Sequence, residues 1–176
     1  KVEITSTFDG HMIPADYIYA LGQEGDKDNP TVILVHGLGG NRYTNYPLAE
    51  MFLQKGYNVL TYDQRSSNEN TAQYTTFGYW EKYDLIDYID YVYAHAPEQV
   101  IGIWGTSFGG ATAGLAINSE ADTLTPQFME QDIYDAIHND AIKMIWTVDD
   151  SEHTEMWLDY NQEYREKVEE LLNSLK

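Results

Sequence analysis

The chain contains no cysteine, few basic residues and no long apolar run, and each of these features excludes some classes of function. Without cysteine, the 176 residues carry neither a disulfide framework nor a thiol nucleophile. Ten basic residues against 29 acidic ones give a net charge of −19. That charge repels nucleic acids and anionic membrane surfaces and disfavours strongly anionic substrates. We interpret the acidic excess as a solubilising surface.

No segment reaches the ~18 consecutive apolar residues that a membrane span requires. We therefore predict no membrane span. The absence of cysteine fits a cytoplasmic protein but does not exclude a secreted one. Histidine and acidic residues do not cluster at metal-ligand spacing, and no phosphate-binding or dinucleotide motif occurs. We expect neither a metal nor another cofactor. The hydrophobic fraction of 43% is enough for a packed core, and the length fits one domain.

The segment 105–109, Gly-Thr-Ser-Phe-Gly, is the most informative motif of the chain. It follows the apolar run 100–104 and precedes the small residues 110–116, so the pattern predicts a strand, a sharp turn and a helix. Ser107 stands at the apex of that turn. A strained backbone would expose its hydroxyl, and the flanking glycines would let strand and helix approach closely. A glycine-rich turn with a serine N-cap gives the same pattern, so the interpretation depends on further motifs.

A second motif begins with the strand-like run 31–35, which is followed by His36-Gly37-Leu38-Gly39-Gly40. The apolar and β-branched residues of the run predict a buried parallel strand. The glycines that follow allow backbone N–H groups to turn inward. We interpret His36 as a structural residue that is bonded within its own loop.

A third motif, 149–153, follows the strand-like run 143–148 and precedes a long amphipathic segment over 159–175. It contains His153, which is the only histidine that both follows a strand-like run closely and comes after Ser107. The three histidines that lie outside these motifs are interpreted as surface or helix-capping residues: His11, His95 and His138.

Together, the three motifs resemble those of the α/β-hydrolase family, of the serine esterase and lipase type, from about Val2 to the carboxyl terminus. The resemblance implies a mostly parallel sheet flanked by helices. It also implies that Ser107 is the nucleophile and His153 the general base, with the N–H groups of Leu38 and Phe108 binding the oxyanion.

The family order of serine, acid and histidine implies that Asp122 is the acid, because it begins an Asp-x-x-x-Pro loop and a helix-like segment over 127–137 follows. By itself this stretch would indicate only a turn or N-cap residue. Asp149 and Asp150 are the alternative acids. The implied activity is cleavage of a small-molecule carboxylic ester through an acyl-enzyme. A peptidase or amidase with the same triad, and a non-catalytic binding scaffold, are the alternatives.

One feature departs from the family: Ser107 and Asp122 lie unusually close in the sequence. Family members place a helix, at least one strand and often a lid between them. Residues 113–117 are predicted to continue the helix, which leaves no room for the strand. We therefore expect a single domain over 1–176 with a deletion or a missing segment near 117–122. Three explanations are open at this stage. The lid and strand are disordered, they are deleted, or the carboxyl-terminal part pairs with a second copy of the chain in a homodimer or domain swap.

The remaining patterns predict a regular alternation of strands and helices, which is typical of a parallel sheet covered on both faces. The predicted elements are a hairpin of strands 2–6 and 12–19, a helix near 46–55 closed by Gly56, a strand over 57–63 and a helix over 79–95. Arg65, in the loop after the strand, is expected to be structural. In the helix over 79–95 we predict a core-facing stripe of Tyr83, Ile86, Ile89 and Tyr93.

Overall fold

The computed structural model of the chain describes residues 1–97, 100–113, 116–119, 145–148, 150 and 159–173. The chain divides into two compact units, Lys1–Ala113 and Gly114–Lys176. Each unit is described by itself below.

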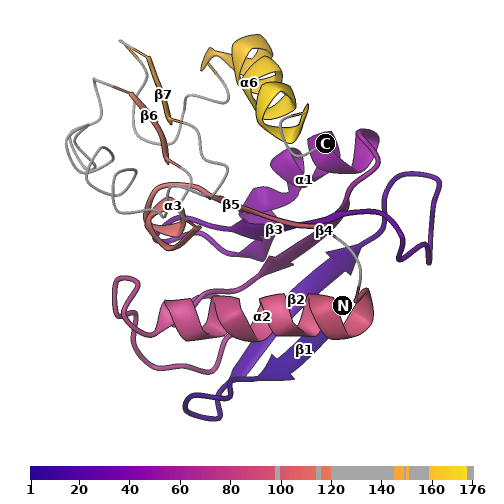
Figure 1. Cartoon of the computed structure of the whole chain (residues 1–176). Coiled ribbons are helices and arrows are strands. Elements are labelled where there is room, and N and C mark those ends of the chain that lie inside the picture. Colours follow the sequence, from indigo (N-terminus) through magenta and orange to yellow (C-terminus); the bar gives the residue numbers. More distant parts are fainter. Residues whose placement is uncertain (98–99, 114–115, 120–144, 149, 151–158, 174–176) are drawn as a thin grey trace. The chain divides into compact units, whose positions relative to one another are not determined.

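The first unit is built on a five-stranded sheet with the order β1-β2-β4-β3-β5 (Figure 1). The strands are β1 (Val2–Thr5), β2 (Met12–Ile18), β3 (Thr31–Val35), β4 (Asn58–Tyr62) and β5 (Ile101–Gly105). β1 and β2 form the predicted hairpin, and β2 continues antiparallel onto β4. β4, β3 and β5 are parallel, so their carboxyl ends meet at one edge of the sheet.

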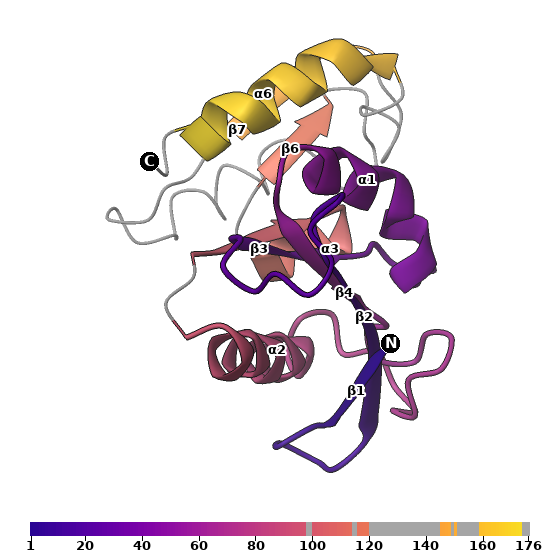
Figure 2. The ribbon, with the colours of Figure 1, turned by 90° about the vertical axis from the view of Figure 1, so that its right-hand side faces the viewer.

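Two helices cover opposite faces of this sheet, α1 (Tyr46–Gln54) and α2 (Glu81–His95) (Figure 2). All residues of β3 and β4 are buried, as expected for strands covered on both sides. One face packs against α2 through a core of Ile13, Ala15, Ile33, Val35, Leu60, Tyr62, Leu85, Tyr88 and Val92. On α1, Phe52 is fully buried and its ring lies 5.8 Å from that of Trp104. A short 3-10 turn, η1 (Arg42–Asn45), leads into α1.

The predicted core stripe of α2 is only partly correct: Ile89 packs against the core, but the stripe as a whole is rotated about the helix axis. Ile86 and Tyr93 are each 48% exposed, whereas Leu85, Tyr88 and Val92 are buried. The reason is that α2 also turns carboxylates inward, where they are hydrogen-bonded to neighbouring loops. A pattern that counts only apolar residues as buried places the inner face incorrectly when charged residues share that face.

The helix after Ser107 is shorter than predicted. α3 (Phe108–Ala113) ends before residue 116, and β6 (Ala116–Ser119) lies where the sequence predicted the helix to continue. A strand therefore does lie between Ser107 and Asp122, contrary to the expectation that none would fit. The pairing of β6 with another strand outweighs the weak helical preference of the small residues before it. Residues 120–122 lie outside the described residues, so an interruption there stays a prediction.

In the second unit, the described residues form a two-stranded parallel sheet and the helix α6. β6 pairs with β7 (Ile145–Val148), with Ala116 opposite Ile145. α6 (Asn161–Asn173) agrees with the predicted amphipathic segment. The predicted helix over 127–137 lies outside the described residues. Across the described parts of the chain, none of the helices combines the length and the apolar character that a membrane crossing needs.

Candidate active site

Ser107 occupies the sharp turn between β5 and α3 and has a φ of +54°, in the left-handed region that non-glycine residues rarely adopt. The turn is tight: the Gly109 N–H donates to the Thr106 carbonyl at 2.9 Å, and the Gly110 N–H donates to the Ser107 carbonyl at 2.7 Å. The Thr106 N–H donates to the Val35 carbonyl at 3.1 Å, which joins the turn to the end of β3.

Two glycines make this turn sterically feasible. A Cβ atom on Gly105 would lie 2.0 Å from the carbonyl oxygen of Gly109, and one on Gly109 would lie 2.2 Å from the carbonyl oxygen of Val35. Strand, turn and neighbouring strand therefore pack backbone against backbone. Gly37 completes the arrangement, since a Cβ there would lie 3.3 Å from the Cβ of Ser107. The glycine loop after β3 thus passes directly beside the serine.

In the first unit, a cavity of about 430 Å³ opens at the edge of the sheet where the carboxyl ends of the parallel strands meet. Leu38 and Phe108, the two residues predicted to bind the oxyanion through their N–H groups, line this cavity. The other lining residues are mostly small or polar: His36, Gly37, Gly39, Gly40, Asn41, Gln64, Arg65, Ser66, Ser67, Asn68 and Thr75. The carboxyl ends of the parallel strands thus form a hollow next to Ser107, which is where open α/β sheets bind ligands.

Backbone strain gathers around the same cavity. Among the described residues, the non-glycine residues with positive φ are Ser66, Asn68, Phe77 and Ser107. Ser66 and Asn68 line the cavity, and the ring of Phe77 lies 5.8 Å from that of the lining residue Phe108. Such conformations cost energy and persist where the surrounding structure holds them, most often at functional sites.

His36 is buried, and both of its ring nitrogens are bonded to the backbone. Nε2 accepts the N–H of Gln64 at 2.9 Å, so the ring proton lies on Nδ1, which donates to the Gly37 carbonyl at 2.7 Å. Burial lowers the pKa of His36, which favours this neutral form. The Gln64 side-chain amide in turn donates to the carbonyl of His36. The geometry agrees with the structural role expected for this histidine, since its bonds join the glycine loop to the loop after β4.

Arg65 is also buried and has the structural role that the sequence suggested. Its Nη1 donates to Asp9 at 2.7 Å and its Nη2 to Asp84 at 2.8 Å. The hydrogen bond from Arg65 lowers the pKa of Asp9, whereas burial raises the pKa of Asp84 despite the same partner. His11 was expected at the surface, but its side chain is nearly buried, with Nδ1 2.5 Å from Asp9. The ring of His95 is half-buried at the end of α2.

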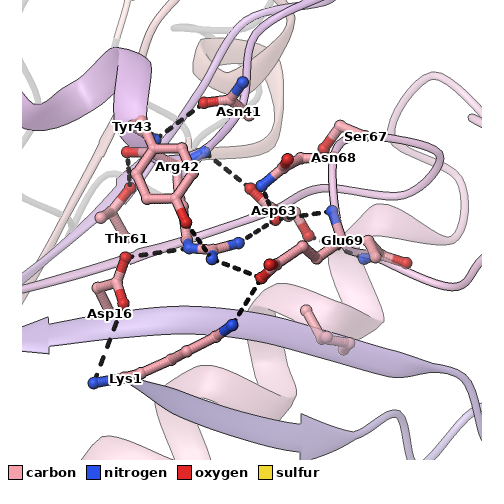
Figure 3. Close-up of polar contacts among 12 residues, drawn as sticks. Lys1, Asp16, Asn41, Arg42, Tyr43, Thr61, Asp63, Ser67, Asn68 and Glu69 are labelled. Atoms are coloured by element: carbon pink, nitrogen blue, oxygen red, sulfur yellow. Dashed lines mark hydrogen bonds and ion pairs between the residues drawn. The ribbon is translucent and has the colours of Figure 1, made fainter.

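A second ion-pair cluster surrounds the buried residue Arg42, as Figure 3 shows, and no sequence motif indicated it. The Arg42 guanidinium donates to Asp63 through Nη1, to Asp16 at 3.0 Å through Nε and to Glu69 at 2.6 Å through Nη2. Burial lowers the pKa of Arg42, but its hydrogen bond to Glu69 and the charge of Asp63 raise it more. Asp63 also accepts the side-chain amide of Asn68 at 2.9 Å, which fixes the cavity wall.

The structure brings Ser107, Leu38 and Phe108 together at one edge of the sheet. Asp122, His153, Asp149 and His138 lie outside the described residues. The alternative acid Asp150 accepts a hydrogen bond from the hydroxyl of Tyr160. Within the described part of the chain, histidine, aspartate and glutamate form no group of three or more that could hold a metal ion.

A family model described as the alpha/beta hydrolase fold matches residues 30–123, which include β3, the glycine loop, the Ser107 turn and Asp122. The chain belongs to the α/β-hydrolase family. The predicted membership of the α/β-hydrolase family is thereby confirmed, as is the predicted fold class.

Solved structures of α/β-hydrolases agree with the fold. An esterase of Pyrococcus furiosus superposes with a TM-score of 0.83 at 21% identity, covering 98% of this chain and 91% of that one. An α/β serine hydrolase without a lid from Xanthomonas campestris gives a TM-score of 0.75 at 16% identity, covering 99% and 94% of the two chains. At these identities the likeness concerns the fold alone.

Among curated proteins, the uncharacterized protein YqkD of Bacillus subtilis is 32% identical over 108 residues. The alignment covers 59% of this chain and 35% of that protein. The chain thus spans about a third of the length of this relative.

Proposed function

We propose that this α/β-hydrolase is a serine hydrolase that cleaves uncharged carboxylic esters through an acyl-enzyme. The observation that carries the proposal is the strained φ of +54° at Ser107, in a turn whose glycines allow backbone-to-backbone packing beside a cavity. This is the geometry by which the family exposes a nucleophilic serine. Strained backbone conformations of this kind cluster at active sites, which supports a function at Ser107.

In the proposed reaction, the Ser107 hydroxyl oxygen attacks the ester carbonyl carbon while His153 accepts the hydroxyl proton. The carbonyl oxygen becomes an oxyanion, which the N–H groups of Leu38 and Phe108 stabilise. His153 then protonates the leaving alcohol, and water releases the acid from Ser107 by the reverse steps. Asp122 orients His153 and stabilises its charged form.

The glycine loop supports this assignment of the oxyanion donors. Leu38 and Phe108 come from different segments, yet both line the cavity beside Ser107. The bonds of His36 to the Gln64 N–H and the Gly37 carbonyl hold the loop in place. Because both ring nitrogens are engaged with the backbone, His36 is a poor candidate for the general base, which favours His153.

Two alternatives have the same fold. A peptidase or amidase would use the same triad, and a non-catalytic scaffold would bind a partner without reacting. The similar protein from Pyrococcus furiosus is an esterase, which favours ester hydrolysis. The similar protein from Xanthomonas campestris is a serine hydrolase without a lid, which favours a compact, open site. Rates on matched ester and amide substrates separate the first alternative, and an unreactive Ser107 would indicate the second.

The decisive experiment is labelling with a fluorophosphonate probe, followed by peptide mapping of the adduct. We expect the adduct on Ser107, and we expect Ser107→Ala to abolish both labelling and hydrolysis of p-nitrophenyl acetate. His153→Ala should lower turnover by about 10³-fold or more, with the thermal midpoint unchanged. An adduct on another serine, with Ser107 unmodified, would overturn the proposal.

A further inference from the structure

Phe77 is an aromatic residue in a position that stability does not explain. Its side chain is 72% exposed, so its burial contributes little to folding. Its φ of +52° lies in the left-handed region, which is unfavourable for a bulky side chain and which glycine or asparagine would adopt more easily. An exposed phenylalanine with an unfavourable backbone conformation therefore calls for another reason.

The strained conformation is held by Glu81, a fully buried residue at the start of α2. Its carboxylate accepts the N–H of Thr76 at 2.7 Å, the hydroxyl of Thr76 at 2.7 Å and the N–H of Gly78 at 2.8 Å. The residues on both sides of Phe77 are therefore fixed by one buried group. The loop presents the ring in a defined place, because hydrogen bonds to a buried carboxylate are strong and geometrically demanding.

The place in question is beside Ser107. The ring of Phe77 packs edge-on against that of Phe108, with centroids 5.8 Å apart and an interplanar angle of 65°. Phe108 directly follows Ser107 and lines the cavity, as does Leu38, which is 60% exposed. The cavity walls are otherwise largely polar, so these side chains provide apolar surface close to the proposed reaction centre.

We propose that Phe77 is a specificity-determining residue that binds the apolar group of the ester substrate. The substrates are then uncharged esters with an alkyl or aryl group large enough to cover the Phe77 and Phe108 rings. The negative charge of the protein also disfavours anionic esters. The apolar group could come from the acid or from the alcohol of the ester, and the two series of substrates below distinguish these sources. This inference rests on the proposed function of Ser107.

The test compares Phe77→Asn and Phe77→Leu with the matched control Tyr79→Asn. Asparagine removes the ring but tolerates the left-handed backbone, and leucine keeps apolar surface. Tyr79 belongs to the same segment, is 69% exposed and packs near Trp80. The substrates are p-nitrophenyl acetate against octanoate for the acid, and ethyl against octyl acetate for the alcohol. The readouts are kcat/KM and the thermal midpoint.

We expect Phe77→Asn to lower the long-to-short ratio of kcat/KM by about tenfold in one of the two series, since that is the scale of losing one apolar contact surface. The rate on the acetates should fall less than the rate on the long esters, and the thermal midpoint should not fall, because asparagine adopts the left-handed conformation more easily than phenylalanine. Phe77→Leu should retain part of the ratio, and Tyr79→Asn should retain all of it. An unchanged ratio in both series, an equal effect of Tyr79→Asn, or a uniform loss on all esters with a lower midpoint would overturn this inference alone. A wild-type protein that neither hydrolyses these esters nor is labelled at Ser107 would overturn the proposed function as well.

Discussion

The sharpest test of the Ser107 turn is the substitution Gly105→Ala. The new Cβ atom would lie 2.0 Å from the carbonyl oxygen of Gly109, 2.2 Å from its carbonyl carbon and 2.5 Å from the nitrogen of Gly110. All three atoms belong to the backbone, so no side-chain rotation relieves the contact. Gly102 provides a matched control in the same strand, because a Cβ there would meet only Val32 Cγ2 at 3.5 Å, an ordinary contact.

The expected loss in the free energy of unfolding follows from how far the backbone would have to move. Relief of the clash at Gly105 requires a shift of about 1 Å in a segment that is also tied to β3, and a close-packed interior offers little space for it. Overpacking typically costs about 1–3 kcal/mol, and a contact with rigid backbone belongs at the upper end, at about 3 kcal/mol. Gly102→Ala instead restricts the unfolded chain and should be neutral or stabilise the fold by up to about 1 kcal/mol.

Urea unfolding followed by tryptophan fluorescence measures both effects, and the rate of fluorophosphonate labelling reports the geometry of Ser107. We expect Gly105→Ala to unfold at lower urea concentration with a similar dependence on urea, and to be labelled more slowly than Gly102→Ala. If the free energies of unfolding of the two variants differ by less than about 0.5 kcal/mol, the close approach of strand and helix deduced from the glycines is wrong.

Three further predictions concern buried polar groups. Arg42→Met should lower the free energy of unfolding by about 3–5 kcal/mol, because Asp63 stays buried without its cation; adding Asp63→Asn should recover part of that loss in the same urea assay. The hydroxyl of Tyr62 is buried without a hydrogen-bond partner among the described residues, so Tyr62→Phe should leave the thermal midpoint unchanged or raise it; a drop of several degrees would contradict this. Burial raises the pKa of Glu81, but its hydrogen bonds outweigh burial and hold that pKa below its usual value. The stability that Glu81 contributes is therefore present above the unfolded-state pKa and is lost as pH falls through the folded-state pKa. The gap in free energy of unfolding between wild type and Glu81→Gln should therefore narrow below about pH 4.5, and a constant gap down to pH 3 would count against the assignment.

The strands of the first unit could be predicted from the sequence because their signals are local. Apolar and β-branched runs bounded by turn residues locate β3, β4 and β5 to within about two residues. The inner face of α2 could not be predicted in the same way. Its buried carboxylates bond to partners far along the chain, such as Arg65, so the apolar residues alone indicate the wrong face.

The prediction that the helix after Ser107 would continue over 113–117 was wrong for a related reason. Small residues such as those of 110–116 are compatible with a helix, and the helix does begin as predicted. It ends at Ala113 because the next segment pairs with β7, which lies about 30 residues further along the chain. Strand pairing over such a separation leaves no local trace in the sequence.

Within the candidate site, the sequence located the backbone features but not the side chains that support them. Glycine spacing predicts the turn at Ser107 and the loop containing Leu38, because only glycine allows the close approaches seen there. The Arg42 cluster had no such signal, since its partners Asp16, Asp63 and Glu69 each lie more than 20 residues away. The only available indication was the small number of basic residues in so acidic a chain, which makes each buried arginine notable.

The acidic excess consequently has a second role beside solubility. Asp63, Asp84 and Glu81 are fully buried, and each bonds to a segment near the cavity: Asp63 to Asn68, Asp84 to Arg65, and Glu81 to the residues flanking Phe77. A buried carboxylate can accept several hydrogen bonds at once, which allows it to fix loops that have little apolar surface of their own. The strained residues Ser66, Asn68 and Phe77 lie in the loops so held. The buried carboxylates therefore supply the rigidity that offsets this strain, and loss of any one of them should loosen the wall of the cavity nearest to it before it unfolds the sheet.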